Sequence, residues 1–224
     1  MQVLSQQEIL MIIEGLRDTL IIVGFSTFFG YVLGLPLGII LAVTDKDGIK
    51  PNLIVYKTLD LVTNILRSFP FIILLVVLIP VTRAIVGKSY GIGATIVPLV
   101  FAAAPFIGRM VESSLKEVDK GVIEAAQSLG AGNVTIIFKV LIAEARTSLL
   151  VGATIAFGTI LGYSAMAGAV GGGGLGSIAI RYGYNRFQPQ ILWPSVIILI
   201  LLVQLFQMIG MRMSNKLDRR KKGR

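Results

Sequence analysis

The chain has 224 residues, of which 54% are hydrophobic and 15% are charged, and its formal net charge is +9. A soluble domain has about 25% charged residues, so the apolar surplus predicts a protein that exposes much of its surface to lipid. The sequence contains no Cys and no His. This excludes disulfides, thiol nucleophiles, imidazole bases and the usual zinc sites, and we expect no catalytic residue and no metal site.

Stretches without charge predict where the chain crosses the membrane. They cover residues 19–44, 68–82, 89–108, 147–180 and 187–211. A helix needs about 20 apolar residues to cross about 30 Å of hydrocarbon. We therefore expect an all-α, polytopic membrane protein that forms a single transmembrane domain over 1–224. Its five transmembrane helices are expected at about 19–43, 61–82, 91–109, 147–169 and 190–211.

Basic residues predict the orientation of these spans. The tail 212–224 contains seven Lys or Arg and one acid, Asp218. By the positive-inside rule the tail is cytoplasmic, and an odd number of spans then places the N-terminus outside. With Arg67 set aside, fifteen basic residues fall inside and five outside. The excess charge thus indicates topology and attraction to anionic membrane lipid, and we expect no nucleic-acid partner.

Two features of the first and second spans have structural or functional interpretations. Gly30, Gly34 and Gly38 recur every fourth residue, a spacing that lets a second helix approach closely, and we favour ordinary packing. Arg67, next to Ser68, lies among apolar residues, where a guanidinium is costly unless it faces a polar interior or reaches the interface. The Arg67 side chain either extends to the cytoplasmic surface of the membrane or lines a translocation path, and we give both interpretations equal weight. Pro70 is expected to bend this helix.

The long inside loop, residues 112–146, contains a short amphipathic pattern. Val122, Ile123, Ala126 and Leu129 fall on one helical face, and Gly130 suits a helix C-terminus. A helix lying on the bilayer surface is the alternative, but the face is narrow and lacks the Trp or Phe of an interfacial anchor. We interpret this segment as a helix that docks on a partner.

Glycine-rich segments elsewhere do not predict nucleotide binding. Gly87-Lys88-Ser89 lacks the upstream glycine of a phosphate-binding loop, because Thr82 stands there. Residues 171–176 match a dinucleotide motif by spacing alone, without a preceding strand or a nearby acid. A tight break where a helix ends outside is the simpler interpretation.

The loop resembles a known family. Glu124-Ala125-Ala126, Gly130, Val140 and Ile142 are similar to the E-A-A-x-x-x-G-x9-I-x-L-P loop of ABC-importer membrane permeases, in which it forms a coupling helix that docks on the ATP-hydrolysing subunit. The resemblance implies that residues 122–126, 129 and 130 couple this chain to an ATPase (Val122, Ile123, Glu124, Ala125, Ala126, Leu129, Gly130). Ala143 replaces the final Pro, so we expect a less sharply bent helix after the loop.

Most of the chain resembles the methionine-importer permease subfamily. Segments 64–87, 96–112 and 162–184 carry this similarity, which implies the fold of a type I ABC importer permease in a bacterial inner membrane. It also implies a homodimer, two copies of a partner ATPase that hold ATP and Mg²⁺, and an extracytoplasmic amino-acid-binding lipoprotein. No cofactor is expected on this chain. The implied function is import of methionine, as the D- or L-form.

The fourth span is expected to line the translocation path. Tyr163, Ser164 and Met166 lie among small residues, and Met packs well into irregular gaps. Met166 at a gate and Met166 as core filler or lipid-facing side chain both remain open.

Three other functions are alternatives. The permease could carry another amino acid or a related small solute. An ion-coupled secondary transporter would need intramembrane acids, for which Asp60 is the only candidate. A membrane scaffold would not require a docking helix.

Overall fold

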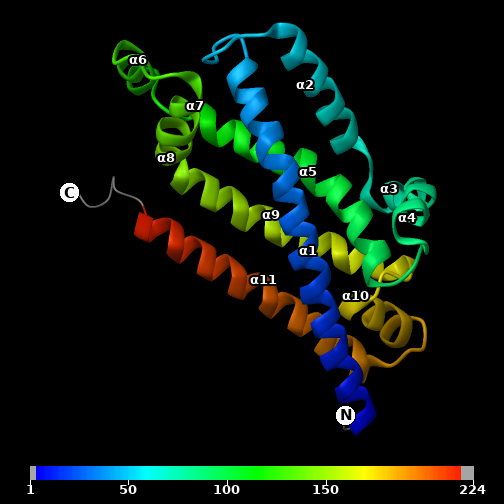
Figure 1. The fold of residues 1–224 in the computed structure, drawn as a ribbon. Coiled ribbons are helices and arrows are strands. Elements are labelled where there is room, and N and C mark those ends of the chain that lie inside the picture. The colour runs from blue at the N-terminus through cyan, green and yellow to red at the C-terminus, as the bar shows by residue number, and fades with distance from the viewer. Residues whose placement is uncertain (1–3, 218–224) are drawn as a thin grey trace. The chain divides into compact units, whose positions relative to one another are not determined.

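The computed structural model describes residues 4–217, and Figure 1 shows its helices. Residues 218–224 of the predicted basic tail lie outside the described residues. Within 4–217 all regular elements are helical, which agrees with the predicted all-α class. The elements are α1 (Gln6–Thr44), α2 (Leu53–Ser68), α3 (Phe71–Val77), α4 (Ile79–Val86), α5 (Ile92–Lys116), α6 (Lys120–Ser128), α7 (Asn133–Thr135), η1 (Ile136–Leu141), α8 (Ile142–Glu144), α9 (Arg146–Ala167), η2 (Gly168–Val170), α10 (Gly174–Ile178), η3 (Ala179–Tyr184) and α11 (Pro189–Leu217).

Four helical runs are long and apolar enough to cross a membrane. They are Gln6–Thr44, Ile92–Lys116, Arg146–Tyr184 and Pro189–Leu217. The pair α2 and α3 is a fifth if it counts as one broken span. These helices correspond to the five predicted transmembrane helices, and the protein is therefore a multi-pass membrane protein.

The predicted second span, 61–82, is not one continuous helix. It is divided into α2, α3 and α4, with a break at Phe69 and Pro70 and another at Leu78. Pro70 stands at the N-cap of α3 with φ −58° and ψ 128°, and a proline has no N–H to continue the preceding helix. Pro80 lies in the first turn of α4, where proline is well tolerated.

The first helix begins well before the predicted residue 19 because the chain carries an N-terminal capping box. The backbone N–H of Ser5 donates to Glu8 Oε2 at 2.7 Å, and the N–H of Glu8 donates to Ser5 Oγ at 3.3 Å. Each side chain thus satisfies a backbone donor that the first turn leaves free. The Ser-x-x-Glu spacing is a signal that could have placed this boundary.

The chain divides into two compact units, and the long helices contribute to both. Among the described residues, the first unit contains 4–30, 69–103 and 157–207. In it the glycine run after α9 is fixed by threonines of α1 and α5. Thr19 Oγ1 accepts from the N–H of Leu175 at 2.9 Å, and Thr95 Oγ1 donates to the carbonyl of Gly172 at 2.7 Å. The run is therefore a structured turn.

The second unit contains residues 31–68, 104–156 and 208–217 of the part that the structure describes. Here α1 and α5 pack closely through glycines. A Cβ on Gly34 would lie 2.7 Å from the carbonyl oxygen of Ala104, and one on Gly38 would collide with Val111 and the carbonyl of Gly108. The predicted small-residue face therefore does bring a helix close, as ordinary packing.

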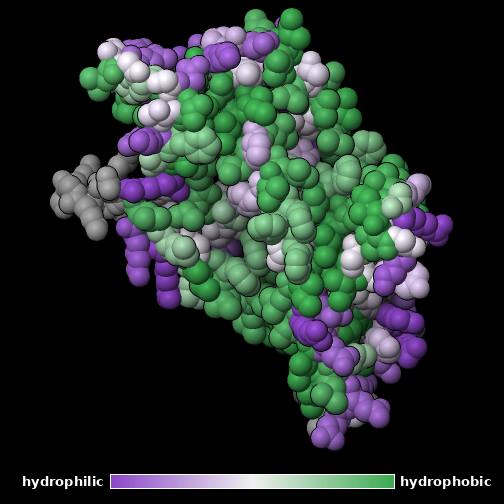
Figure 2. Space-filling model, viewed as in Figure 1, coloured by the Kyte–Doolittle hydropathy of each residue, from purple (hydrophilic) through white to green (hydrophobic). Residues whose placement is uncertain are grey.

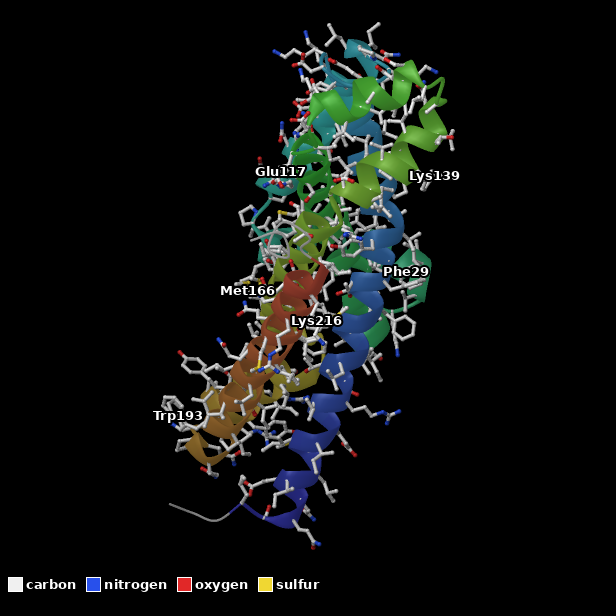
Figure 3. The ribbon with its side chains drawn as sticks, turned by 90° about the vertical axis from the view of Figure 1, so that its left-hand side faces the viewer. Phe29, Glu117, Lys139, Met166, Trp193 and Lys216 are labelled. Carbon is white, nitrogen blue, oxygen red and sulfur yellow. The ribbon has the colours of Figure 1, made fainter. Side chains whose placement is uncertain are left out.

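Many apolar side chains are left on the surface, as expected for helices that face lipid. Phe29 and Trp193 are 44% and 63% exposed, and both point outward from their helices (Figure 3). Figure 2 shows hydrophobic residues over most of the visible face, with hydrophilic ones gathered near α6, along the α1–α2 loop and at the start of α1. This division agrees with the membrane spans found above.

Candidate functional site

The predicted docking helix is present as α6, in the second unit. Its start is fixed by Asp119, whose Oδ1 accepts from the N–H of Gly121 at 2.7 Å. Asp119 itself has extended backbone angles, φ −60° and ψ 130°, so it is an N-cap residue that satisfies a donor of the first turn. The extended backbone of Asp119 thus separates α6 from α5, which ends at Lys116.

The end of α6 is a Schellman motif centred on Gly130. Gly130 has φ +79°, its N–H donates to the carbonyl of Gln127 at 2.9 Å, and the N–H of Ala131 donates to the carbonyl of Ala126 at 3.1 Å. These two bonds satisfy carbonyls that the last helical turn leaves free. A glycine is favoured there because the left-handed backbone region disfavours residues with a Cβ.

Only part of the predicted docking face is free. Ile123 and Ala126 are half-buried, and α6 packs against η1 of the same loop. Val122 and Leu129 are 42% and 88% exposed, and Glu124, on the adjoining face, is exposed as well. The apolar stripe therefore has two roles: its middle seats the helix on its own chain, and its ends remain available to a partner.

Two further apolar side chains of this loop are exposed and were not predicted. Val134 and Phe138 are 69% and 62% exposed. They lie four residues apart on α7 and η1, a spacing that places side chains on one helical face. The signal was in the sequence, as two apolar residues at helical spacing in the long loop 112–146. The exposed apolar surface therefore extends beyond α6.

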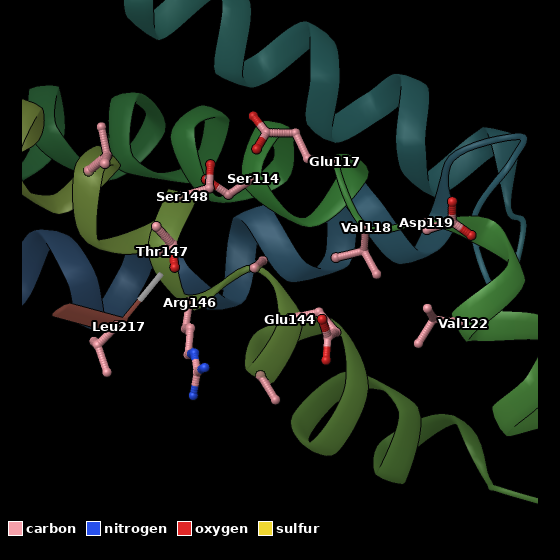
Figure 4. Close-up of a pocket in the computed structure, with 13 residues that line it drawn as sticks. Ser114, Glu117, Val118, Asp119, Val122, Glu144, Arg146, Thr147, Ser148 and Leu217 are labelled. Atoms are coloured by element: carbon pink, nitrogen blue, oxygen red, sulfur yellow. The ribbon is translucent and has the colours of Figure 1, made fainter. Parts of the chain in front are cut away.

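A cavity of about 610 Å³ lies beside the start of α6. It is lined by the ends of α5 and α11 and by the starts of α6 and α9 (Figure 4). Its lining includes the carboxyls of Glu117 and Glu144 and the guanidinium of Arg146, and the last two extend to the same side in this view. Ser148 Oγ donates to Ser114 Oγ at 3.0 Å in its wall. The cavity therefore has a mixed-charge lining next to the exposed Val122.

The loop region rests on a cluster of charged side chains at the end of α5. Glu112, with a side chain 5% exposed, accepts from Arg109 Nη1 and from Lys116 Nζ, both at 2.7 Å. Tyr56 Oη of α2 also donates to it, at 3.3 Å. Positions 109, 112 and 116 are spaced by three and four residues, which places them on one helical face. That spacing could have revealed the cluster, which sequence reasoning missed.

Asp60 belongs to the same cluster. Arg109 Nη2 donates to Asp60 Oδ1 and, at 2.9 Å, to Asn64 Oδ1. The acid that stood out as a candidate for ion coupling is therefore paired with a guanidinium from a helix 49 residues away in the chain. A paired carboxylate at the end of a span has a structural explanation.

The α1–α2 loop is joined to both sides of the α5–α6 connection. Asp45 Oδ2 lies 2.7 Å from Lys116 Nζ, and Asp47 Oδ1 lies 3.4 Å from Lys120 Nζ. The hydrogen bond from Lys116 holds the pKa of the Asp45 carboxyl below its usual range. Asp45 is therefore ionised at neutral pH, with its partner at the end of α5.

The predicted path residues fall into two groups. Arg67 and Ser68 are exposed at the end of α2, in the second unit, and Ser68 Oγ donates to the carbonyl of Asn64 at 2.8 Å. Tyr163 and Met166 lie on α9, in the first unit. Contacts within either unit do not assemble these groups into one site.

The first-unit group is organised around an aromatic stack. The rings of Tyr163 and Phe71 are 4.5 Å apart and nearly parallel, with 8° between their planes. Met166 is 48% exposed, whereas Ser164 is buried and its Oγ donates to the carbonyl of Leu161 at 2.8 Å. Phe71, which sequence reasoning missed, thus ties the residue after the Pro70 break to α9.

Ala143, which replaces the final Pro of the family loop, lies in α8, just before a break between two helices. The chain still breaks there, at Ala145, which has φ −77° and ψ −1° between α8 and α9. The N–H groups of Ala145 and Leu149 continue the hydrogen bonding across it, at 2.9 and 2.8 Å. No proline is therefore needed to separate the two helices.

Among residues 4–217, His, Cys, Asp and Glu do not gather in a group of three or more that could hold a metal ion.

Known proteins of similar sequence and structure are membrane transport subunits. A probable D-methionine transport system permease protein MetI of Vibrio cholerae is 48% identical over 203 residues, 91% of this chain and 90% of the relative. The D-methionine transport system permease protein MetI of Escherichia coli K12 is 48% identical over 165 residues, 74% of this chain and 76% of that protein.

Solved structures agree. A structure of the inward-facing MetNI methionine ABC transporter contains a chain that is 45% identical and superposes with a TM-score of 0.95, covering 96% of this chain and all of that one. An amino acid ABC transporter structure with histidines, 17% identical, has the same fold with a TM-score of 0.71, over 98% of this chain and all of that one.

The family comparison covers most of the sequence. The family described as binding-protein-dependent transport system inner membrane component matches residues 34–223. Its members are permease subunits and not enzymes, in keeping with the absence of catalytic chemistry predicted from composition. This chain therefore belongs to the family of binding-protein-dependent transport system inner membrane components.

Proposed function

We propose that this chain is the permease subunit of an ATP-driven importer of methionine. The observation that carries the proposal is its 48% identity, over 91% of the chain, to a probable D-methionine permease. In this proposal two copies of the chain enclose the translocation path and work with two copies of a separate ATPase, which holds ATP and Mg²⁺. The 45% identical chain of the MetNI transporter structure supports this assembly.

The exposed ends of α6 are the proposed contact with the ATPase. Capping at Asp119 and Gly130 holds a nine-residue helix that has no buried residue of its own, and Leu129 offers a large apolar side chain for a partner cleft. ATP binding can bias the transporter only if the ATPase holds the inward and outward states with different affinity. Residues 122–126, 129 and 130 then act as the lever.

The proposed gate lies on α9. Met166 is half-exposed, one helical turn from Tyr163, whose ring is fixed on Phe71. A flexible thioether beside a fixed ring can close a narrow path and withdraw from it. Arg67 and Ser68, exposed at the end of α2, are separate path candidates in the second unit. Ser164 supports the helix through its bond to Leu161.

The proposed orientation follows the charge distribution. The N-terminus lies outside and the basic tail 212–224 inside, near anionic lipid. The ion cluster and α6 are then cytoplasmic. The outer surface then meets an amino-acid-binding lipoprotein. Candidate contacts are the exposed Arg181 and the half-buried ring of Tyr182. The centroid of that ring lies 4.7 Å from the guanidinium carbon of Arg186.

Uptake in proteoliposomes tests the function. The chain is reconstituted with its partner ATPase and binding lipoprotein, and uptake of L-methionine, D-methionine and other amino acids is measured with ATP inside. We expect ATP-dependent uptake of methionine above all others. Preferential uptake of another amino acid would show that methionine is not the substrate. Uptake driven by an ion gradient without ATP would show that the chain is not part of an ATP-driven importer.

A further inference from the structure

The cluster at the end of α5 joins three separate chain segments through one buried carboxylate. Glu112 contacts Arg109 and Lys116 of its own helix and Tyr56 of α2. Through these cations it is linked to Asp60 of α2 and to Asp45 of the α1–α2 loop. The whole cluster lies inside the second unit, which also contains α6.

Stability alone is a weak explanation for this arrangement. Removing charges from water is costly, and replacing a buried ion pair by apolar residues of similar volume is often neutral or stabilising. Apolar side chains could therefore hold α2 on α5. An ion cluster differs from an apolar contact because it fixes direction: the guanidinium of Arg109 is a rigid fork that bonds Asp60, Asn64 and Glu112 at once.

The position of the cluster connects it with α6. Lys116 ends α5, and α6 begins at Lys120. The α1–α2 loop contacts both of these lysines, through Asp45 and Asp47. A movement of α6 therefore also moves the end of α5. The ion cluster connects that end of α5 to α2, so α2 can move with it.

We propose that Glu112 is a positioning residue for energy coupling, because it fastens α2 to α5 so that both move with α6 as one body. Arg109 and Asp60 form the connection between the helices, and Glu112 holds Arg109 in place. The inference rests on the proposed function, since it concerns how movement imposed on α6 by an ATPase reaches the membrane helices.

The first test is Glu112→Gln in the reconstituted complex. Methionine uptake and ATP hydrolysis are measured together, because a folding defect lowers both while loss of coupling lowers uptake per ATP. We expect methionine uptake per ATP to fall by about tenfold. Gln removes the negative charge that bonds Arg109 and Lys116, and losing one charge-assisted hydrogen bond corresponds to about a factor of ten in an equilibrium constant. Glu14→Gln is the control, since Glu14 is an exposed glutamate of α1 that lies outside the cluster and outside the candidate site, and it should keep the wild-type ratio. A wild-type ratio in Glu112→Gln overturns the proposal.

The second test replaces the ion pair by a covalent link. The chain has no cysteine, so the two thiols of Asp60→Cys/Arg109→Cys, with a cysteine-free ATPase, can be joined by a short bis-methanethiosulfonate cross-linker, which forms a disulfide with each thiol and releases a sulfinate from each end. We expect low methionine uptake per ATP before cross-linking, because α2 and α5 are no longer fastened. Cross-linking should restore this ratio, because the two helices then move together again. If linking blocks uptake, or if the unlinked variant couples normally, the proposal is wrong.

The two tests also separate this inference from the proposed function. If the wild-type complex imports no methionine, the proposed function fails and the cluster is not at issue. If Glu112→Gln does not assemble, the linked pair still tests whether α2 must be fastened to α5 for coupling, because it leaves Glu112 intact, and a failure there overturns the proposal.

Discussion

Replacing Gly130 by alanine should loosen α6 through backbone strain alone. Gly130 has φ +79°, and nothing lies within 4 Å of the position that a Cβ would occupy. The cost therefore contains no steric clash. For an L-residue the left-handed region costs roughly 1–2 kcal/mol, which corresponds to a factor of about 5 to 30 in an equilibrium constant.

Hydrogen exchange of the reconstituted permease measures this cost locally. The helix has no buried residue, so it opens without global unfolding, and its amides exchange through that local opening. Exchange of the α6 amides in Gly130→Ala should be about 5 to 30 times faster than in wild type. Gly130→Asn should show a smaller effect, because asparagine tolerates the left-handed region.

Gly132 offers the matched control two residues away. It has φ −71° and an equally open Cβ position. Gly132→Ala should leave exchange unchanged or slow it slightly, since alanine restricts the unfolded chain by about 0.4–1 kcal/mol. If both alanine variants exchange alike, or if Gly130→Ala matches wild type, the backbone argument is refuted. In the coupled complex, Gly130→Ala should also reduce uptake more than Gly132→Ala does.

Three further predictions concern a cap, an ion pair and the gate. Asp119→Ala should weaken the start of α6 by about 1 kcal/mol and speed exchange there, whereas Asp119→Asn should not; equal exchange in both would contradict the cap. Because Lys116 lowers the pKa of Asp45, the carboxylate stabilises the fold at neutral pH and loses this effect as pH falls through its lowered folded value. The Tm of wild type should thus exceed that of Asp45→Asn at pH 7, and a difference that persists in strong acid would contradict this assignment. Met166→Cys should cross-link between two copies in the resting state, and failure to do so would remove Met166 from the gate.

The sequence was sufficient for the features that local pattern controls. Lengths of uncharged sequence predicted the membrane helices, and the spacing from Val122 to Gly130 predicted α6 with its glycine end. The break in the second span was only partly predictable. Pro70 indicated a bend, but the division of 61–82 into three helices also depends on Leu78 and on packing of the short segments, which local sequence does not determine.

Contacts between distant segments explain most of what the sequence did not reveal. Asp60 looked like an isolated acid because its partner, Arg109, comes from another helix. The spacing of Arg109 and Glu112 was visible, but its meaning depended on α2 being alongside. The stack of Phe71 on Tyr163 was hidden for the same reason.

A helix proposed to act as a lever must keep both its shape and its orientation, and different contacts of this loop provide the two. Nine residues are too few for a helix to be stable in water by itself, and α6 has no buried residue to add hydrophobic stabilisation. Its shape must therefore come from the caps at Asp119 and Gly130, and its orientation from half-buried Ile123 and from the ion pair of Lys120 with Asp47. An exposed pair of that kind is weak alone. The partly buried cluster next to it, centred on the buried Glu112, supplies the rigid base, which explains why costly charges are placed at the end of α5 and not along the lipid-facing helices.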